Sequence, residues 1–253
     1  MSKLTKKLRQ IPESAAPPLG FKTTTISPSQ LMLVIAVLTN RNASVVSQLT
    51  EAKVDAVLIH SKDLGRELQT IQKIASPLND IPWGVWPETV TEEGIEGLKE
   101  MGGDFIIFMA SEAPASLLRD EVGKVMKITL PCEEGLIGAI DQLPIDAVLL
   151  DFRGEGENLT ISQLMNCQWI AGSINKPLLV AIQQRLGDKE MQALWEVGVK
   201  GLLVEVEEKP LTELMKLRQA IATLSPASRK SGERRAVLPH LELEADSASP
   251  DEI

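Results

Sequence analysis

The chain has 253 residues, a formal net charge of −9, no tyrosine and only four phenylalanines. This composition argues against nucleic-acid binding, because nucleic-acid grooves are basic and their bases stack on aromatic side chains. The two cysteines, Cys132 and Cys167, are too few for a disulfide framework or a zinc site, which fits a reducing cytoplasm. The apolar run Leu31–Leu38 is too short to span a bilayer and lies too far from the N-terminus to be a signal core.

Apolar runs recur along the chain, and each is followed by a segment with helical spacing. Most runs are continuously apolar rather than alternating, which is typical of parallel strands buried on both faces. The predicted strands are Leu31–Leu38, Asp55–His60, Ile81–Trp86, Asp104–Ala110, Val125–Leu130, Asp146–Phe152, Pro177–Ile182 and Gly201–Val206.

The segments between the strands place apolar residues three and four positions apart, which is the spacing of an amphipathic helix. The predicted helices are Ala43–Lys53, Leu64–Ala75, Thr91–Met101, Glu133–Gln142, Ile161–Ile174, Lys189–Val199 and Leu211–Leu224, with Pro114–Val122 as a shorter candidate. Eight strand–helix units in succession predict a fold of the α/β class, a closed (β/α)8 TIM barrel. The competing doubly wound sheet usually has a glycine-rich first turn, and Thr39-Asn-Arg-Asn-Ala contains no glycine.

Both ends of the chain differ from the barrel predicted over 31–224. The charged residues of 1–30 are mostly basic, and we expect a short helical arm that packs on the end or side of the barrel. Its apolar residues on one helical face are Leu4, Leu8 and Ile11. A helix for a membrane surface or a partner protein is the alternative. Residues 225–253 are rich in serine, proline and charge and predict a flexible tail, and either end could contact a partner or a second copy.

Polar residues gather at the C-terminal ends of the predicted strands, which is the end where TIM barrels hold their sites. Alternation along each strand decides which side chains face inward, and Glu205 is expected inward because burying it against the helices would be costly. The expected mouth residues are Asn40, His60, Trp86, Lys127, Thr129, Asp151, Gln183 and Glu205.

Lys127 and Asp151 lie on adjacent predicted strands and are expected to form an ion pair. The pair, alone or with Glu205, is either a structural ion pair that fills the barrel or part of a catalytic site. In the second case Lys127 could form a Schiff base with a carbonyl substrate, or contact a flavin or an anionic substrate. Asp151 could be a general base with His60 as the acid, or His60 could simply be a hydrogen-bonded lining residue.

The loop after the sixth strand, Arg153-Gly-Glu-Gly-Glu-Asn, predicts a lid. Arg153 and Arg185 either grip an anion at the mouth or remain solvated loop residues. A substrate would also contact Asn40, Trp86, Thr129 and Gln183. No metal ligand is predicted, because the spacing of the mouth carboxylates and His60 matches no metal motif.

The run Leu194-Trp-Glu-Val-Gly-Val-Lys-Gly-Leu-Leu-Val-Glu-Val resembles the last unit of phosphate-binding TIM barrels. These include nitropropane-dioxygenase-like flavin oxidoreductases and histidine- and thiamine-biosynthesis barrels, in which a glycine cradles a phosphate. Here Glu205 stands at the place of that glycine, and its carboxylate would repel a phosphate. The resemblance therefore implies the barrel fold, with the phosphate-binding glycine signature degraded.

Three functions are compatible with this sequence. The first is a cytoplasmic enzyme that binds a small polar metabolite and performs lyase or isomerase chemistry, with Lys127 and Asp151 as the chemical pair and His60 and Glu205 assisting. The second is a non-catalytic barrel that serves as a subunit or scaffold. The third is a flavin- or phosphate-dependent oxidoreductase with an atypical cofactor site. The sequence itself assigns no cofactor.

Overall fold

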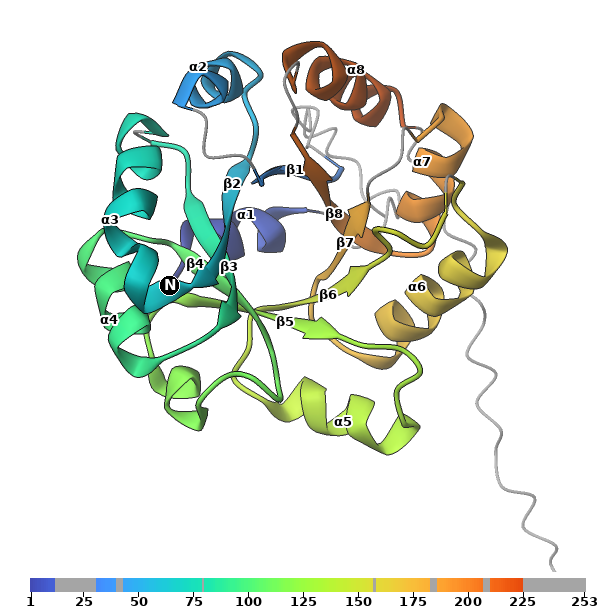
Figure 1. Cartoon of the computed structure of the whole chain (residues 1–253). Coiled ribbons are helices and arrows are strands. Elements are labelled where there is room, and N and C mark those ends of the chain that lie inside the picture. Colours follow the sequence, from blue (N-terminus) through green and yellow to red (C-terminus); the bar gives the residue numbers. More distant parts are fainter. Residues whose placement is uncertain are drawn as a thin grey trace, which may run out of the picture.

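The computed structural model describes residues 1–11, 31–39, 43–78, 80–156, 158–182, 186–206 and 210–224. Eight parallel strands pair in chain order, and β8 pairs with β1 to close a barrel (Figure 1). The strands are β1 (Leu33–Leu38), β2 (Ala56–Asp63), β3 (Trp83–Thr89), β4 (Phe105–Met109), β5 (Gly123–Ile128), β6 (Ala147–Asp151), β7 (Leu178–Ile182) and β8 (Val199–Glu205). The predicted TIM barrel is confirmed, although the strand ends differ from the predicted ones by a few residues.

Helices surround the barrel on its outer side (Figure 1). They are α2 (Ala43–Glu51), α3 (Leu64–Ala75), α4 (Glu92–Glu100), α5 (Glu134–Gln142), α6 (Ile161–Ser173), α7 (Asp188–Glu196) and α8 (Pro210–Thr223), with a short 3-10 turn η1 (Ser76–Leu78) after α3. No helix within the described ranges is long and apolar enough to cross a membrane.

The unit between β4 and β5 departs from the prediction. The predicted helix Pro114–Val122 is wrong, because this segment forms only a five-residue 3-10 helix, η2 (Ala115–Arg119). Pro114 and Asp120 on either side are extended, and Leu117 is the one buried residue of the helix. A segment with so little apolar surface to bury gains little from a full α-helix, because helices in proteins are stabilised mainly by packing of an apolar face.

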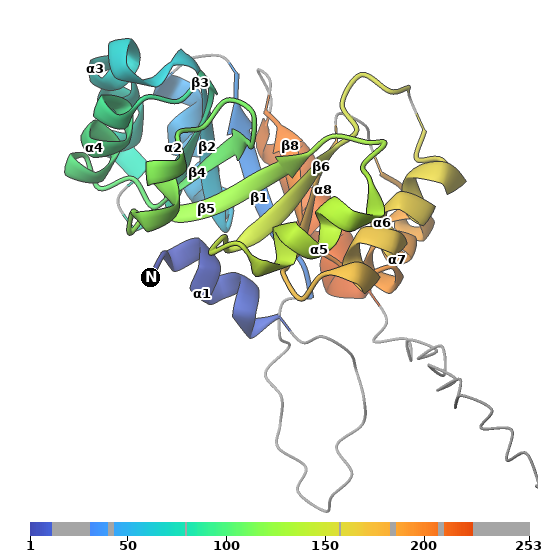
Figure 2. The same ribbon diagram turned by 90° about the horizontal axis from the view of Figure 1, so that it is seen from below.

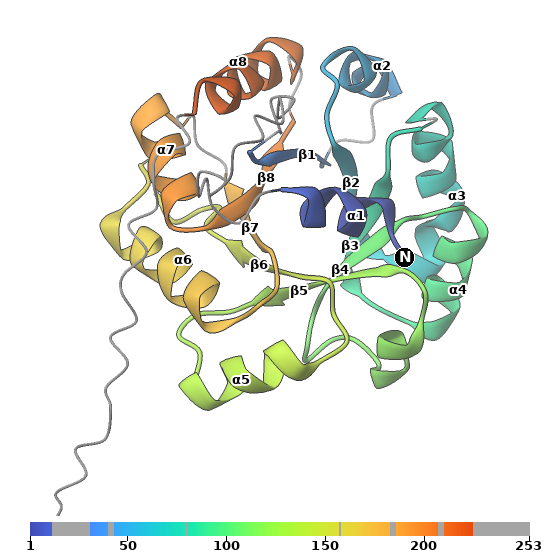
Figure 3. The same cartoon turned by 180° about the vertical axis from the view of Figure 1, so that it is seen from behind.

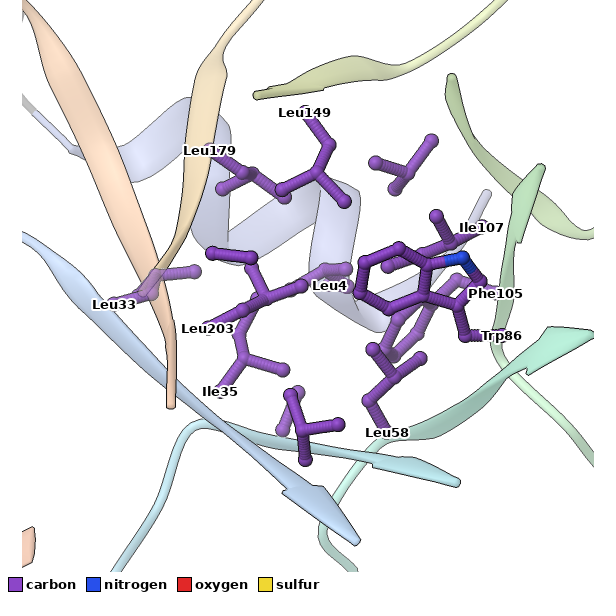
Figure 4. Close-up of a cluster of buried hydrophobic side chains, with 14 of the residues drawn as sticks. Leu4, Leu33, Ile35, Leu58, Trp86, Phe105, Ile107, Leu149, Leu179 and Leu203 are labelled. Atoms are coloured by element: carbon purple, nitrogen blue, oxygen red, sulfur yellow. The ribbon is translucent and has the colours of Figure 1, made fainter. Parts of the chain in front are cut away.

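The barrel interior is filled by alternate residues of the strands. Figure 4 shows the labelled set, which comprises Leu33, Ile35, Leu58, Trp86, Phe105, Ile107, Leu149, Leu179 and Leu203, together with Leu4 from outside the barrel. A glycine at position 84 makes room for one of them. A Cβ atom on Gly84 would lie 2.4 Å from the Phe105 carbonyl oxygen and 2.6 Å from its ring, so any larger residue would force β3 and β4 apart.

The helix α1 (Lys3–Gln10) lies across the N-terminal end of the barrel (Figures 2 and 3). Leu4 and Leu8 are almost fully buried there. The Asp104 carboxylate, just before β4, accepts hydrogen bonds from Ser2 Oγ at 2.8 Å and from the backbone N–H groups of Lys3 at 2.6 Å and Leu4 at 2.8 Å. The apolar face of α1 is therefore covered by the barrel itself, as expected for a helix packed on the barrel end.

An aspartate precedes each of three even-numbered strands and ties neighbouring segments together. Asp55 before β2 accepts a hydrogen bond from Val34 N at 2.9 Å, and Asp146 before β6 accepts one from Lys124 N, also at 2.9 Å. Asp104 before β4 instead caps α1. These buried or half-buried carboxylates hold the N-terminal end of the barrel together.

The predicted tail 225–253 and residues 12–30 of the predicted arm lie outside the described ranges.

Candidate active site at the C-terminal mouth

Most of the predicted mouth residues that the structure describes meet at one end of the barrel. The strand registers place His60 beside Trp86, Met109 beside Lys127, and Val37 beside Glu205. Three predicted residues lie outside the described ranges, namely Asn40, Gln183 and Arg185.

Thr129 is the exception among the predicted lining residues. β5 begins and ends two residues earlier than predicted, so that Ile128 is its last residue and Thr129 lies beyond the sheet, exposed to solvent. Alternation applies only where the strand pairing continues, so the strand does not fix the direction of the Thr129 side chain, and its place among the lining residues stays a prediction.

Asp151 is the centre of an ion network at the mouth. Lys127 Nζ donates to its Oδ2 at 3.0 Å, which is the pair expected from the adjacent strands β5 and β6. Arg153 Nε donates to Oδ1 at 2.8 Å and Arg153 Nη2 donates to Oδ2 at 3.0 Å. Only 10% of the Asp151 side chain is exposed, and both of its oxygens face cations. This carboxylate is therefore firmly held.

Arg153 connects two sides of the mouth. Besides the two bonds that its side chain makes to Asp151, Arg153 donates from Nη1 to Glu205 Oε1 at 2.7 Å and so joins β6 to β8. Its side chain is 18% exposed, so the alternative of a solvated loop residue is wrong for Arg153. The chain turns at Gly154, whose φ of +81° is favourable only for glycine. This turn comes directly after Arg153, whose side chain reaches across the mouth.

The Trp86 ring forms a platform beneath the cations. The guanidinium carbon of Arg153 lies 4.2 Å and Lys127 Nζ lies 5.4 Å from the ring centroid. His60 stands beside the same ring, with centroids 6.3 Å apart and the planes tilted by 53°. Cations this close to an indole are attracted to its face, so Trp86 helps to position both donors.

Burial and the network change the protonation of two mouth residues. Burial pushes the pKa of Asp151 up, but the hydrogen bonds and charges of Arg153 and Lys127 outweigh it and hold this pKa below its usual 3.8. Burial lowers the pKa of His60 below 6.5, and the Arg153 charge adds to this effect against the opposing charges of nearby glutamates. At neutral pH Asp151 is therefore ionised and His60 is neutral.

Three glutamates lie near His60, and two of them, Glu67 and Glu88, were not among the residues predicted from sequence. The third, Glu205, was among the predicted mouth residues. Glu67 Oε2 accepts a hydrogen bond from the buried Ser61 Oγ at 2.7 Å and one from Lys62 N at 3.2 Å. β2 and β3 continue their pairing past the barrel rim, from Ser61 beside Pro87 to Asp63 beside Thr89. A glutamate in the first turn of the helix after β2 was the sequence signal that could have indicated this contact.

The loop after β6 is tied to α6. Glu155 Oε2 accepts a hydrogen bond from Gln163 Nε2 at 2.9 Å, and Gln163 in turn forms a capping box with Thr160 at the start of α6. The predicted lid movement of this loop stays a prediction, and any such movement would begin from this anchored state. Among the described residues, no group of three or more His, Cys, Asp and Glu side chains is placed to hold a metal ion.

The chain matches no protein-family model and no curated sequence. It is similar in structure to a mutant tryptophan synthase α-subunit from the hyperthermophile Pyrococcus furiosus, with 12% identity and a TM-score of 0.59 over 76% of this chain and 97% of that one. Thiamine phosphate pyrophosphorylase from Pyrococcus furiosus is 11% identical, with a TM-score of 0.55 over 75% and 95% of the two chains.

A third similar structure is N-acetylneuraminic acid synthetase from Leptospira borgpetersenii, which is 9% identical, with a TM-score of 0.57 over 75% of this chain and 82% of that one. Identities this low carry no residue roles from one protein to another. What the three likenesses establish is the architecture: this chain is a TIM barrel.

Proposed function

We propose that this barrel is an enzyme that binds a small polar metabolite at its mouth and transfers a proton in a lyase or isomerase reaction. The observation that carries the proposal is the convergence of Lys127, Asp151, Arg153 and Glu205 over the Trp86 ring, beside a neutral His60. In TIM-barrel enzymes the catalytic residues come from the C-terminal ends of several strands, as these charged side chains do. Structures of similar fold include synthases, which is compatible with this class of chemistry.

Proton transfer is assigned to His60. A neutral imidazole can accept a proton from a substrate carbon or hydroxyl and return it to another atom. Asp151 is a weaker base in this arrangement, because Lys127 and Arg153 stabilise its ionised form. Its role here is to hold the two cations in place. This assignment differs from the sequence hypothesis, in which Asp151 is the base and His60 is the acid.

Lys127 is assigned to the substrate oxygen. An ammonium group has three N–H donors, and its bond to Asp151 uses one of them. A remaining donor can polarise a carbonyl and stabilise the enolate that forms when a neighbouring carbon loses its proton. Schiff-base formation would require Lys127 to leave this pair as a neutral amine, because only the neutral amine attacks a carbonyl.

The direct test is proton exchange in heavy water. Purified protein is incubated with a panel of 2-oxo acids, 2-hydroxy acids and sugar phosphates, and deuterium uptake at carbon is followed by NMR. We expect uptake with at least one compound, and its loss in His60→Gln and Lys127→Met. Lys99→Met is the matched control, because Lys99 forms an exposed ion pair with Asp120 at 2.8 Å away from the mouth. No exchange and no binding across the panel would contradict the proposal.

A barrel without turnover is the second candidate, and one observation favours it. The charges of Lys127, Arg153, Asp151 and Glu205 balance and contact one another, as in a network that only closes the barrel. Native mass spectrometry and an absorbance spectrum of the purified protein distinguish the candidates. A stable complex with another protein would favour a subunit or scaffold, and a yellow colour or a bound phosphorylated mass would favour the flavin- or phosphate-dependent alternative.

A further inference from the structure

We infer that the ligand of this mouth carries a carboxylate group, and that Glu205 occupies the place of that carboxylate until the ligand displaces it. The inference rests on the proposed function, because it concerns the same mouth, and it adds the ligand class and a residue that sets affinity. The ligand class is a small 2-oxo or 2-hydroxy carboxylate.

The contacts of Arg153 are divided unequally between two carboxylates. A guanidinium presents five N–H donors along two edges, and each edge can bind both oxygens of one carboxylate. Asp151 takes the edge formed by Nε and Nη2 with two bonds, at 2.8 and 3.0 Å. Glu205 reaches Nη1 through the single oxygen Oε1 at 2.7 Å. The edge formed by Nη1 and Nη2 is therefore bound through one oxygen where a planar carboxylate could bind through two.

The two carboxylates also differ in how firmly they are held. Asp151 is 10% exposed and receives hydrogen bonds from both Lys127 and Arg153. The Glu205 side chain is 23% exposed, belongs to the last residue of β8, and has one more rotatable bond than aspartate. Turning Glu205 into solvent breaks one hydrogen bond, whereas moving Asp151 breaks the network at its centre. Glu205 is therefore the carboxylate that a ligand can replace.

The position of Lys127 narrows the ligand class further. Lys127 Nζ and Arg153 Nη2 both donate to the same atom, Asp151 Oδ2, each at 3.0 Å. Two donors that share one acceptor lie close enough to contact adjacent oxygens of a single small molecule. A carboxylate on Arg153 with an oxo or hydroxyl oxygen on the neighbouring carbon, directed at Lys127, satisfies both donors. The guanidinium carbon of Arg153 lies 4.2 Å from the centroid of the Trp86 ring, so a carboxylate bound to Arg153 would lie close to this ring.

Charge favours a carboxylate over a phosphate at this mouth. The site as it stands holds two cations against two carboxylates. Exchange of Glu205 for a monoanionic ligand preserves this balance around Arg153, whereas a phosphate dianion adds a second negative charge beside Asp151. Pyruvate, glycolate and inorganic phosphate are therefore suitable probes, with pyruvamide as the uncharged analogue of pyruvate.

The test compares Glu205→Gln with wild type by titration of tryptophan fluorescence and ligand-observed NMR. If Glu205 competes with the ligand, the neutral amide releases Arg153, and the Kd for pyruvate or glycolate falls by roughly three- to tenfold. Glu88→Gln is the matched control, because it removes one negative charge near His60 from a residue that makes no contact with Arg153 among the described side chains. It should leave this Kd within about twofold. Pyruvamide should bind weakly to both variants.

Each other outcome overturns the inference. Weaker pyruvate binding by Glu205→Gln would mean that Glu205 contacts the ligand. Unchanged pyruvate binding would mean that Glu205 does not occupy the ligand's place. An equal gain for inorganic phosphate means that any anion is accepted. If no 2-oxo or 2-hydroxy acid of the panel binds but a sugar phosphate does, the inference fails and the proposed function survives, whereas both fail if nothing binds. Should Glu205→Gln not fold, Glu205→Asp keeps the charge but shortens the reach to Nη1, and is expected to tighten binding by a smaller factor.

Discussion

The guanidinium carbon of Arg153 lies 4.2 Å from the centroid of the Trp86 ring, although the two residues belong to different strand–loop units. This contact joins the loop after β6 to β3 across the mouth. Trp86 is therefore at once part of the barrel core, where it is 7% exposed, and the support for the residue that we assign to ligand binding.

We predict that Trp86→Phe destabilises the protein more than Trp83→Phe does. Trp83 has the same exposed fraction and lies three residues earlier in β3, so alternation places it on the opposite face of the strand. Both changes lose similar apolar area, and the excess loss at Trp86 measures its contact with the cations, about 0.5–2 kcal/mol. Urea unfolding gives the two free energies of unfolding. Equal losses of unfolding free energy in the two variants would mean that the contact between the cations and the Trp86 ring adds nothing to stability.

The charge network predicts a ranking of three variants by free energy of unfolding. Arg153→Met leaves two carboxylates without their shared cation and should cost about 3–5 kcal/mol. Lys127→Met leaves Asp151 still bound to Arg153 and should cost about 1–3 kcal/mol, less than a fully buried pair because the Lys127 side chain is 25% exposed. Lys99→Met, at an exposed pair screened by solvent, should cost the least of the three. A reversed order of Arg153 and Lys127 would show that Asp151 depends mainly on the lysine.

The lowered pKa of His60 predicts a loss of stability in mild acid. In the unfolded chain this histidine recovers its ordinary pKa of 6.5, so below that pH the unfolded chain binds more protons than the folded one. The contribution of His60 to the free energy of unfolding is therefore complete above pH 6.5. It is lost as the pH falls through the lowered pKa that His60 has in the folded protein. We expect His60→Gln to flatten the change in free energy of unfolding between about pH 7.5 and 5.5.

The other histidine of the chain, His240, supplies the control for this experiment. Urea unfolding of His240→Gln at each pH gives the effect of removing this second histidine, for comparison with His60→Gln. Should both variants behave alike, the mild-acid loss of stability would have to come from groups other than His60.

The packing of α1 against the barrel predicts that one substitution in this helix, far from the mouth, lowers the free energy of unfolding strongly. Leu8→Ala removes a side chain that is 2% exposed between α1 and the barrel, and should cost about 2–5 kcal/mol. Lys6→Ala, on the exposed face of the same helix, should stay within about 0.5 kcal/mol of wild type. Urea unfolding measures both, and hydrogen exchange at the α1 amides shows whether the helix detaches before the barrel unfolds. Similar behaviour of the two variants would mean that α1 adds little to stability.

Much of the barrel could be predicted from the sequence because its strands are buried on both faces. Continuous apolar runs located all eight strands, and alternation placed Lys127 and Asp151 side by side. The inward direction of Glu205 followed from the cost of burying a carboxylate against helices. These features depend on local pattern alone, so a single sequence was sufficient for them.

The rest depended on contacts that no local pattern encodes. The return of Arg153 over Trp86 requires a particular turn at Gly154 and a long side chain that finds two distant carboxylates. The end of β5 before Thr129 is set by how far its neighbours pair with it, not by its own residues. The segment around η2 has helical spacing, but its depth of burial decided its structure. Tertiary packing overrides propensity in such places.

The barrel interior is packed with side chains, and α1 with its buried Leu4 covers the N-terminal end, so under the proposed function small molecules approach only from the C-terminal end (Figure 4). In the proposed function, substrate and product therefore arrive and depart at the same end of the barrel, above Trp86. Arrival and departure then compete for one passage, so a slowly released product would block the next substrate. Any turnover by this barrel should accordingly show competitive inhibition by its own product.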